Sequence, residues 1–149
     1  MAEDITIRQL KQTLINRPIE EIDVFSILKI IAPLINNPKS SEDARDIHEI
    51  ILRLLEQKEK IYEYEPLLAA LVKEIGLYPY LDAEKLELSD RIAYEYNRPL
   101  GLSNIVFHRI QSEAYRALLS GQNVILSAPT SFGKSLIIDA IIALKKFKK

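Results

Sequence analysis

Residues 128–135 carry the side chains with the clearest chemistry, reading Ala-Pro-Thr-Ser-Phe-Gly-Lys-Ser directly after an apolar Val-Ile-Leu run. A strand that runs into a loop of the form G-x-x-x-x-G-K-[ST] is typical of nucleotide phosphate binding. Ala128 takes the place of the first glycine, whereas Gly133, Lys134 and Ser135 match the pattern. We therefore predict a phosphate-binding loop at this position.

Each matching residue would have a separate role. Gly133 lets the backbone approach a phosphate closely and adopt torsions that other residues avoid. The N–H groups of the loop and of the following helix N-terminus would then point at the anion. Lys134 would place a positive charge between the β- and γ-phosphates, and the Ser135 hydroxyl would ligate Mg²⁺. The simpler alternative is a glycine turn between a buried strand and a buried helix, which does not require lysine and serine beside the glycine.

A second motif lies upstream of the loop. Gln111 stands 17 positions before Ala128, within a Q-x-E-A string that is followed by S-G-x-N and the apolar run. Over residues 101–149 this arrangement resembles the superfamily 2 helicases. It is most similar to the branch that holds archaeal repair helicases and exosome-associated RNA helicases, and bacterial helicases of phage-defence systems look similar here.

This resemblance implies a fold, cofactors and partners. It implies the beginning of an α/β RecA-like domain that binds ATP and Mg²⁺, with Gln111 hydrogen-bonded to the adenine edge and Lys134 as the catalytic residue. It also implies DNA or RNA as the partner of the intact motor. The nucleotide-binding residues predicted in this way are Gln111, Ala128, Pro129, Thr130, Ser131, Phe132, Gly133, Lys134 and Ser135.

The chain lacks other parts that a helicase motor needs. Such a motor has two RecA-like domains and an acidic second motif that holds Mg²⁺ and water, and no D-E-x-[DH] string occurs in these residues. We therefore expect no efficient ATP hydrolysis from this chain alone, and we favour the N-terminal part of a longer helicase. One alternative is a helical protein-interaction module with a non-hydrolysing remnant of the loop. Another is a different P-loop nucleotidase or kinase, for which tight binding of guanine nucleotides would argue.

Composition places the chain among ordinary globular proteins. Of its 149 residues, 48% are hydrophobic and 28% are charged, and cysteine is absent, so disulfides and thiolate metal sites are excluded. The acidic start Met1-Ala2-Glu3-Asp4 is unlike a signal peptide, so we expect a cytoplasmic protein without a membrane span. Residues 1–100 hold 13 Lys and Arg against 19 Asp and Glu, whereas residues 101–149 hold seven against two. The basic end fits contact with nucleotide or nucleic acid, and four of its lysines equally suit a helix C-terminus.

The first hundred residues read as helices separated by proline and polar turns. Apolar spacing predicts helices over about residues 5–16, 20–36, 66–75 and 89–96, and another that opens at residues 40–43 and ends in the charged run 56–60. Ser40 or Ser41 can cap the third helix, Pro66 begins the fourth, and Gly76 suits the C-terminal cap of that helix. Ile92, Ala93 and Tyr96 are expected to face inward from the fifth helix. We predict a helical accessory domain over residues 1–100, which protein partners could contact.

Residues 101–149 would form a second domain of helix, strand, loop and helix. The strand is predicted at 123–127, between helices at about 106–120 and 133–146. It is apolar on both sides, as a central parallel strand would be, but no other segment has strand character. The fold class expected is thus a mainly α domain followed by an incomplete α/β domain, with an exposed apolar flank where sheet neighbours are missing.

Other candidate chemistry is weak. His48 and His108 are isolated from one another, so a structural role is favoured over metal binding. Tyrosine pairs at 62/64, 78/80 and 94/96 could stack on unpaired bases, but acidic neighbours would repel a phosphate backbone, so we favour packing.

Overall fold

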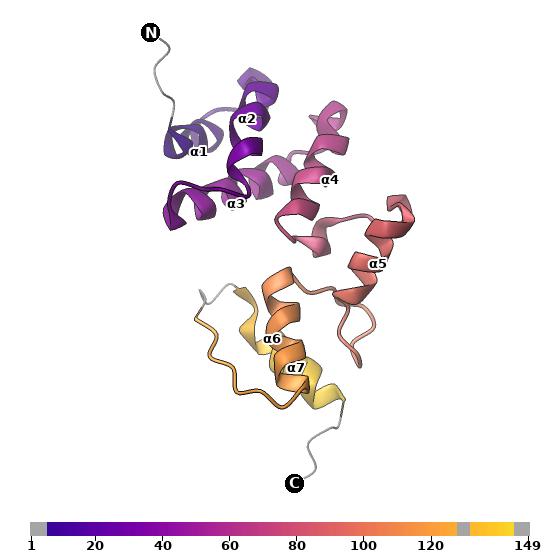
Figure 1. Cartoon of the computed structure of the whole chain (residues 1–149). Coiled ribbons are helices and arrows are strands. Elements are labelled where there is room, and N and C mark those ends of the chain that lie inside the picture. Colours follow the sequence, from indigo (N-terminus) through magenta and orange to yellow (C-terminus); the bar gives the residue numbers. More distant parts are fainter. Residues whose placement is uncertain (1–5, 128–131, 145–149) are drawn as a thin grey trace. The chain divides into compact units, whose positions relative to one another are not determined.

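The fold is given by a computed structural model, which describes residues 6–127 and 132–144 (Figure 1). Within these ranges the chain forms seven α-helices and five short 3₁₀ helices, with no β-strand. It divides into two compact units, residues 1–75 and 76–149. The domain boundary that we predict near residue 100 falls inside the second unit and stays a prediction. None of the helices in the described part of the chain combines the length and apolar character that a membrane span needs.

The first unit begins with two short amphipathic helices. Helix α1 spans Ile7–Asn16 and begins with a capping box, in which the Thr6 hydroxyl accepts the Gln9 N–H and the Gln9 side chain accepts the Thr6 N–H. Helix α2 spans Val24–Ile31, is capped by Asp23 and continues into the 3₁₀ helix η2 (Ala32–Leu34), whose second residue is proline. The 3₁₀ helix η1 (Ile19–Glu21) connects them. The predicted first helix is confirmed, and the proline shortens the second as expected.

Helix α3 is the central element of the first unit. It spans Ser41–Glu56, and the Ser40 hydroxyl caps it by accepting the Asp43 N–H at 3.0 Å, as predicted. The 3₁₀ helix η3 (Tyr62–Tyr64) leads into α4 (Glu65–Glu74), which has Pro66 in its first turn. The core of the unit combines one apolar face from each helix, with fully buried members at Ile31, Ile47, Ile50, Ile51, Leu54, Leu68 and Val72.

Ion pairs between α1 and α3 show that the two helices run in the same direction. The Lys11 ammonium lies 2.5 Å from Asp46 and 3.4 Å from Glu49, and the Arg8 guanidinium lies 3.8 Å from Glu42. Because residue numbers rise together on both helices, α1 and α3 run parallel, with their C-termini at the same end. The hydrogen bond to Asp46 raises the pKa of the Lys11 ammonium.

The second unit begins at a glycine whose backbone is left-handed. Gly76 has φ +76°, its carbonyl accepts the N–H of Arg109 at 3.0 Å, and a Cβ at this position would lie 2.6 Å from the Arg109 Cβ. It follows the end of α4, as predicted. Short 3₁₀ helices η4 (Tyr78–Tyr80) and η5 (Ala83–Lys85) then lead to α5 (Leu88–Tyr96).

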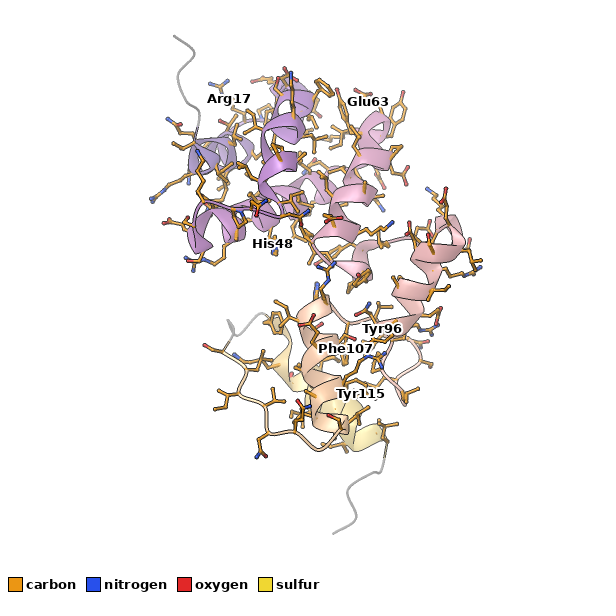
Figure 2. The ribbon with its side chains drawn as sticks, viewed as in Figure 1. Arg17, His48, Glu63, Tyr96, Phe107 and Tyr115 are labelled. Atoms are coloured by element: carbon orange, nitrogen blue, oxygen red, sulfur yellow. The ribbon has the colours of Figure 1, made fainter. Side chains whose placement is uncertain are left out.

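The second unit has its own small core, built on Phe107. The Phe107 side chain is fully buried, its N–H donates to the Asn97 carbonyl at 2.8 Å, and its ring meets the Tyr115 ring edge-on at 5.5 Å. Helix α6 (Arg109–Leu119) and helix α7 (Lys134–Ala143) supply the remaining buried members, Ala114, Tyr115, Ile137, Ala140 and Ile141. Figure 2 shows Phe107 and Tyr115 beside α6.

The predicted strand at 123–127 is wrong for the described structure. The segment runs as an extended stretch without regular secondary structure, and none of its backbone groups has a hydrogen bond within the described residues (Figure 1). The physical reason is the missing ladder, because a strand needs a neighbour and the described ranges supply none. Val124 and Leu126 pack against the Phe107 core, whereas Ile125 is 100% exposed, which confirms the expected apolar flank. No RecA-like α/β domain is therefore shown.

Candidate functional site

The phosphate-loop prediction centres on the start of α7. Gly133 lies at the N-cap of this helix with φ +74°, a left-handed conformation that favours glycine. Lys134 and Ser135 are the first two helical residues, and the N–H groups of a first helical turn have no acceptor within their own helix. The sequence thus places a lysine, a serine hydroxyl and backbone N–H groups together at a helix N-terminus, where anions are favoured.

Gln111 is held directly against this turn. The residue is only 3% exposed, and its amide nitrogen donates to the Phe132 carbonyl at 2.8 Å. The amide oxygen accepts the N–H of His108 at 2.9 Å. A Cβ on Gly133 would lie 3.0 Å from the same amide nitrogen. The structure therefore brings Gln111, Phe132 and Gly133 into contact, and gives the glutamine a role in fixing the turn before α7.

Adenine recognition by Gln111 stays a prediction. Both polar atoms of its amide already bond backbone groups in the described structure, so a base would compete with, or add to, those bonds. The rings beside it include His108, which stacks with Phe132 at 6.5 Å and an interplanar angle of 29°. Tyr80, half exposed, lies 6.1 Å from the His108 ring.

A groove of about 270 Å³ opens beside the start of α7. Lys134 and Ser135 lie at one end, and apolar side chains of α6, α7 and the extended segment form the rest: Ala114, Leu118, Val124, Leu126, Ile137 and Ile138. The described groove is mainly apolar, and Lys134 and Ser135 are its polar side chains. Ala128, Pro129, Thr130 and Ser131 lie outside the described residues, and their predicted contacts with phosphate stay predictions.

A second candidate surface lies on α5, where the sequence predicts a buried face instead. We define the α5 stripe as Leu88, Ile92 and Tyr96, which are 77%, 64% and 58% exposed. They recur at every fourth residue, so they lie on one face of the helix. The inward orientation predicted for Ile92 and Tyr96 is wrong, and no residue of α5 is buried. The periodicity could reveal an apolar face, but not whether the protein itself covers it.

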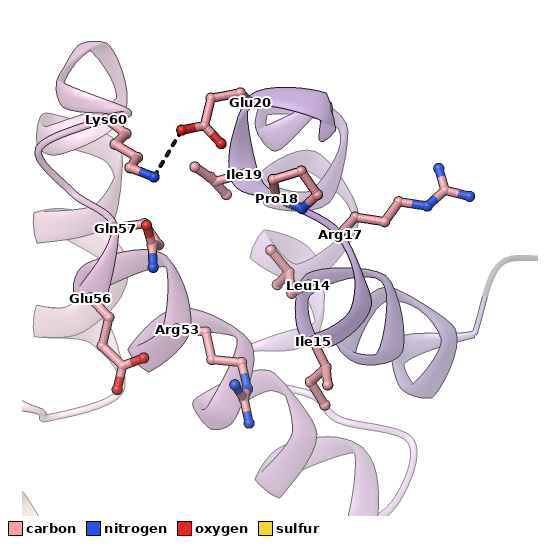
Figure 3. Close-up of a pocket in the computed structure, with 10 residues that line it drawn as sticks. All are labelled: Leu14, Ile15, Arg17, Pro18, Ile19, Glu20, Arg53, Glu56, Gln57 and Lys60. Carbon is pink, nitrogen blue, oxygen red and sulfur yellow. Dashed lines mark ion pairs between the residues drawn. The ribbon is translucent and has the colours of Figure 1, made fainter.

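A third feature is a cleft of about 270 Å³ at the shared C-terminal end of α1 and α3 (Figure 3). Lys60 and Glu20 form an ion pair of 2.8 Å across it, and Arg17 points away from them. The residues that line it are Leu14, Ile15, Arg17, Pro18, Ile19, Glu20, Arg53, Glu56, Gln57 and Lys60. Cations stabilise helix C-termini, and two such termini meet here, so we interpret the basic residues of this cleft as structural.

Metal chemistry finds no support in the described residues. Among them, no group of three or more His, Asp or Glu side chains is placed to hold a metal ion. His48 on α3 belongs to no such group, and partial burial lowers the pKa of its imidazole. Ser135, the predicted Mg²⁺ ligand, is exposed at the second position of α7, and its metal contact stays a prediction.

Comparison with known protein families identifies the relatives of this chain. The model of the anti-bacteriophage protein B N-terminal domain matches residues 1–91, which is more than half of the chain. The chain belongs to this family. It is also 36% identical over 133 residues to anti-bacteriophage protein B of Escherichia coli (strain K12). That match covers 87% of the chain and 18% of the relative, so the chain spans less than a fifth of the relative's length. No solved structure matches.

The resemblance to superfamily 2 helicases is therefore corrected. Both comparisons indicate the anti-bacteriophage protein B family, and neither indicates a helicase family. The G-K-S string and the upstream glutamine remain in the sequence, but they do not establish a motor. Gly133 and Gln111 also have a shared structural role, described above, which does not depend on a helicase.

Proposed function

We propose that this chain is the interaction module of a phage-defence protein, in which helical surfaces recruit a protein partner. The α5 stripe carries the proposal. Exposed Leu, Ile and Tyr side chains in one row along a helix are costly to leave in water, and helix faces of this kind recognise partners through anchors spaced by about one turn. Membership of the family, and the name of the Escherichia coli relative, support a role in defence against bacteriophage.

A charge placed in the α5 stripe tests this proposal. Ile92→Glu in the full-length protein should raise phage plating toward that on cells without the protein, because a buried carboxylate at a central anchor weakens binding by about thirtyfold or more. Arg91→Gln is the matched control, since it changes the net charge by the same one unit at an exposed position of the same helix, about 100° round the axis from Ile92. Full protection by Ile92→Glu protein, at equal abundance, contradicts the proposal.

A second candidate function is binding of ATP with Mg²⁺ at the start of α7. The observation that favours it is Gly133 with φ +74° directly before Lys134 and Ser135, an arrangement suited to a phosphate group. In this proposal Lys134 contacts the phosphates, Ser135 holds the metal, and residues 123–127 become a strand when segments outside residues 1–149 pair with them. Calorimetric titration of the full-length protein with ATP and Mg²⁺ tests it, and absence of binding rejects it.

The remaining expectations change with the family assignment. Contact with DNA or RNA was implied by the helicase resemblance, and it has no support without that resemblance. A cytoplasmic location stays a prediction. ATP hydrolysis is not part of the proposal, because phosphate binding at a helix N-terminus does not require it.

A further inference from the structure

The α5 stripe ends at a cavity in the second unit. The cavity measures about 470 Å³ and lies between η4, the last turn of α5 and one face of α6. Tyr78 and Tyr96 give it aromatic walls, and Asn97 and Ser112 line it with polar groups. Tyr96, which Figure 2 labels at the C-terminal end of α5, belongs both to this cavity and to the stripe, so the two adjoin at this residue.

Several polar groups that line the cavity are buried. Asn97 and Ser112 are only 5% and 3% exposed, and the Arg116 guanidinium lies 3.5 Å from the centre of the Tyr96 ring. The Nε–H of Arg116 is buried without a hydrogen-bond partner in the structure. Buried donors in native proteins are almost always paired, so an unpaired one beside a cavity indicates that an acceptor belongs there.

The charge of the cavity favours one negative group. Arg109 and Arg116 line it together with Glu113, so two guanidinium groups face one carboxylate. Arginine binds carboxylates through paired, charge-assisted hydrogen bonds, which suits a single added carboxylate. Residues 76–149 hold ten Lys and Arg against seven Asp and Glu, and without the four lysines at 145–149 the balance is six against seven.

We propose that this cavity receives an acidic segment of the protein partner, with an apolar or aromatic side chain between the tyrosines and a neighbouring carboxylate on the arginines. The rest of that segment lies along the α5 stripe. This inference rests on the proposed interaction function and adds the chemistry of the partner. Cavities of this size, largely apolar with a few fixed polar groups, are those that bind small ligands and anchoring side chains.

Two short peptides test the chemistry on the 149-residue chain. The probe is acetyl-Gly-Tyr-Glu-Gly-amide, and its control replaces Glu with Gln, with binding followed by amide chemical shifts around Ser112. The Glu peptide should bind about tenfold more tightly, the typical value of a charge-assisted hydrogen bond. Equal binding of both peptides, or no binding, overturns the assignment. Binding of uridine 5′-monophosphate at the cavity, with no binding of either peptide, overturns it as well.

Variants of the chain show whether the preference for the Glu peptide depends on a contact between its carboxylate and an arginine of the cavity. Arg109→Gln should remove the preference for the Glu peptide, whereas Arg91→Gln, exposed on α5 outside the cavity, should keep it. Arg109→Lys retains the charge and should retain part of the preference. Ala93→Leu narrows the cavity and should weaken the binding of both peptides alike. This variant tests the location of the site if Arg109→Gln does not fold. A preference that survives in Arg109→Gln contradicts the proposal.

Phage plating distinguishes failure of the cavity assignment from failure of the proposed interaction function. One outcome is that Ile92→Glu abolishes protection, Arg109→Gln protects fully, and the Glu and Gln peptides bind equally. The cavity assignment is then wrong, but the interaction function is retained. If Ile92→Glu protects fully, the interaction function falls whatever the peptides show.

Discussion

Lys134→Ala should weaken ATP–Mg²⁺ binding by the full-length protein by about ten- to a hundredfold. The reason is that one charged contact to phosphate contributes about 1.5–3 kcal/mol. The remaining N–H groups at the start of α7 would still attract phosphate, so weak binding should persist. Calorimetric titration of ATP in the presence of Mg²⁺ measures the change.

The control for this change is Lys29→Ala. Lys29 is an exposed lysine on α2, so its replacement removes the same charge from the first unit. It should leave the dissociation constant unchanged within error. If both variants bind ATP as the unmodified protein does, Lys134 does not contact the nucleotide, and the phosphate site is assigned wrongly.

Phe107→Ala should destabilise the second unit by about 3–5 kcal/mol, the usual cost of removing a large aromatic side chain from a core. The Phe107 side chain is fully buried, and its ring contacts Tyr115 at the centre of a small core that has few other large members. Small domains have total stabilities of only about 5–15 kcal/mol, so much of this unit would unfold. Urea unfolding followed by circular dichroism measures the loss.

Phe25→Ala is the matched control for Phe107→Ala. Phe25 is 54% exposed on α2, and truncation of such a residue changes stability by about 0.5 kcal/mol or less. The chain contains no tryptophan and seven tyrosines, so tyrosine fluorescence offers a second signal for unfolding. A loss below about 1 kcal/mol for Phe107→Ala would mean that the core is not closed around this ring.

Local signals in the sequence were enough to predict most helices. Ser40 caps α3, Pro66 lies in the first turn of α4, and Gly76 takes up a left-handed conformation after that helix, all as predicted. These features depend on a few neighbouring residues, so the sequence carries them directly. The Gly133 turn also belongs to this group, because glycine is the residue that most readily adopts a positive φ directly before a helix.

Features that depend on distant partners could not be predicted in the same way. Residues 123–127 have the composition of a strand, but strand formation requires a second segment, and the described chain supplies none. Ile92 and Tyr96 have the spacing of a buried face, yet spacing cannot show that nothing covers it. The cavity beside Tyr96 joins side chains from Tyr78 to Arg116, and no sequence motif connects them.

Chemical labelling of Ile92→Cys shows whether a partner covers the α5 stripe. Residues 1–149 contain no cysteine, so mass spectrometry of the peptide around position 92 reports on this thiol. We expect maleimide to label Cys at position 92 rapidly in the purified full-length protein and slowly in phage-infected cells. The Arg91→Cys control should be labelled rapidly in both. Equal labelling of position 92 in both settings would contradict this expectation, and so would slow labelling in the purified protein, since the protein's own chain would then cover the stripe.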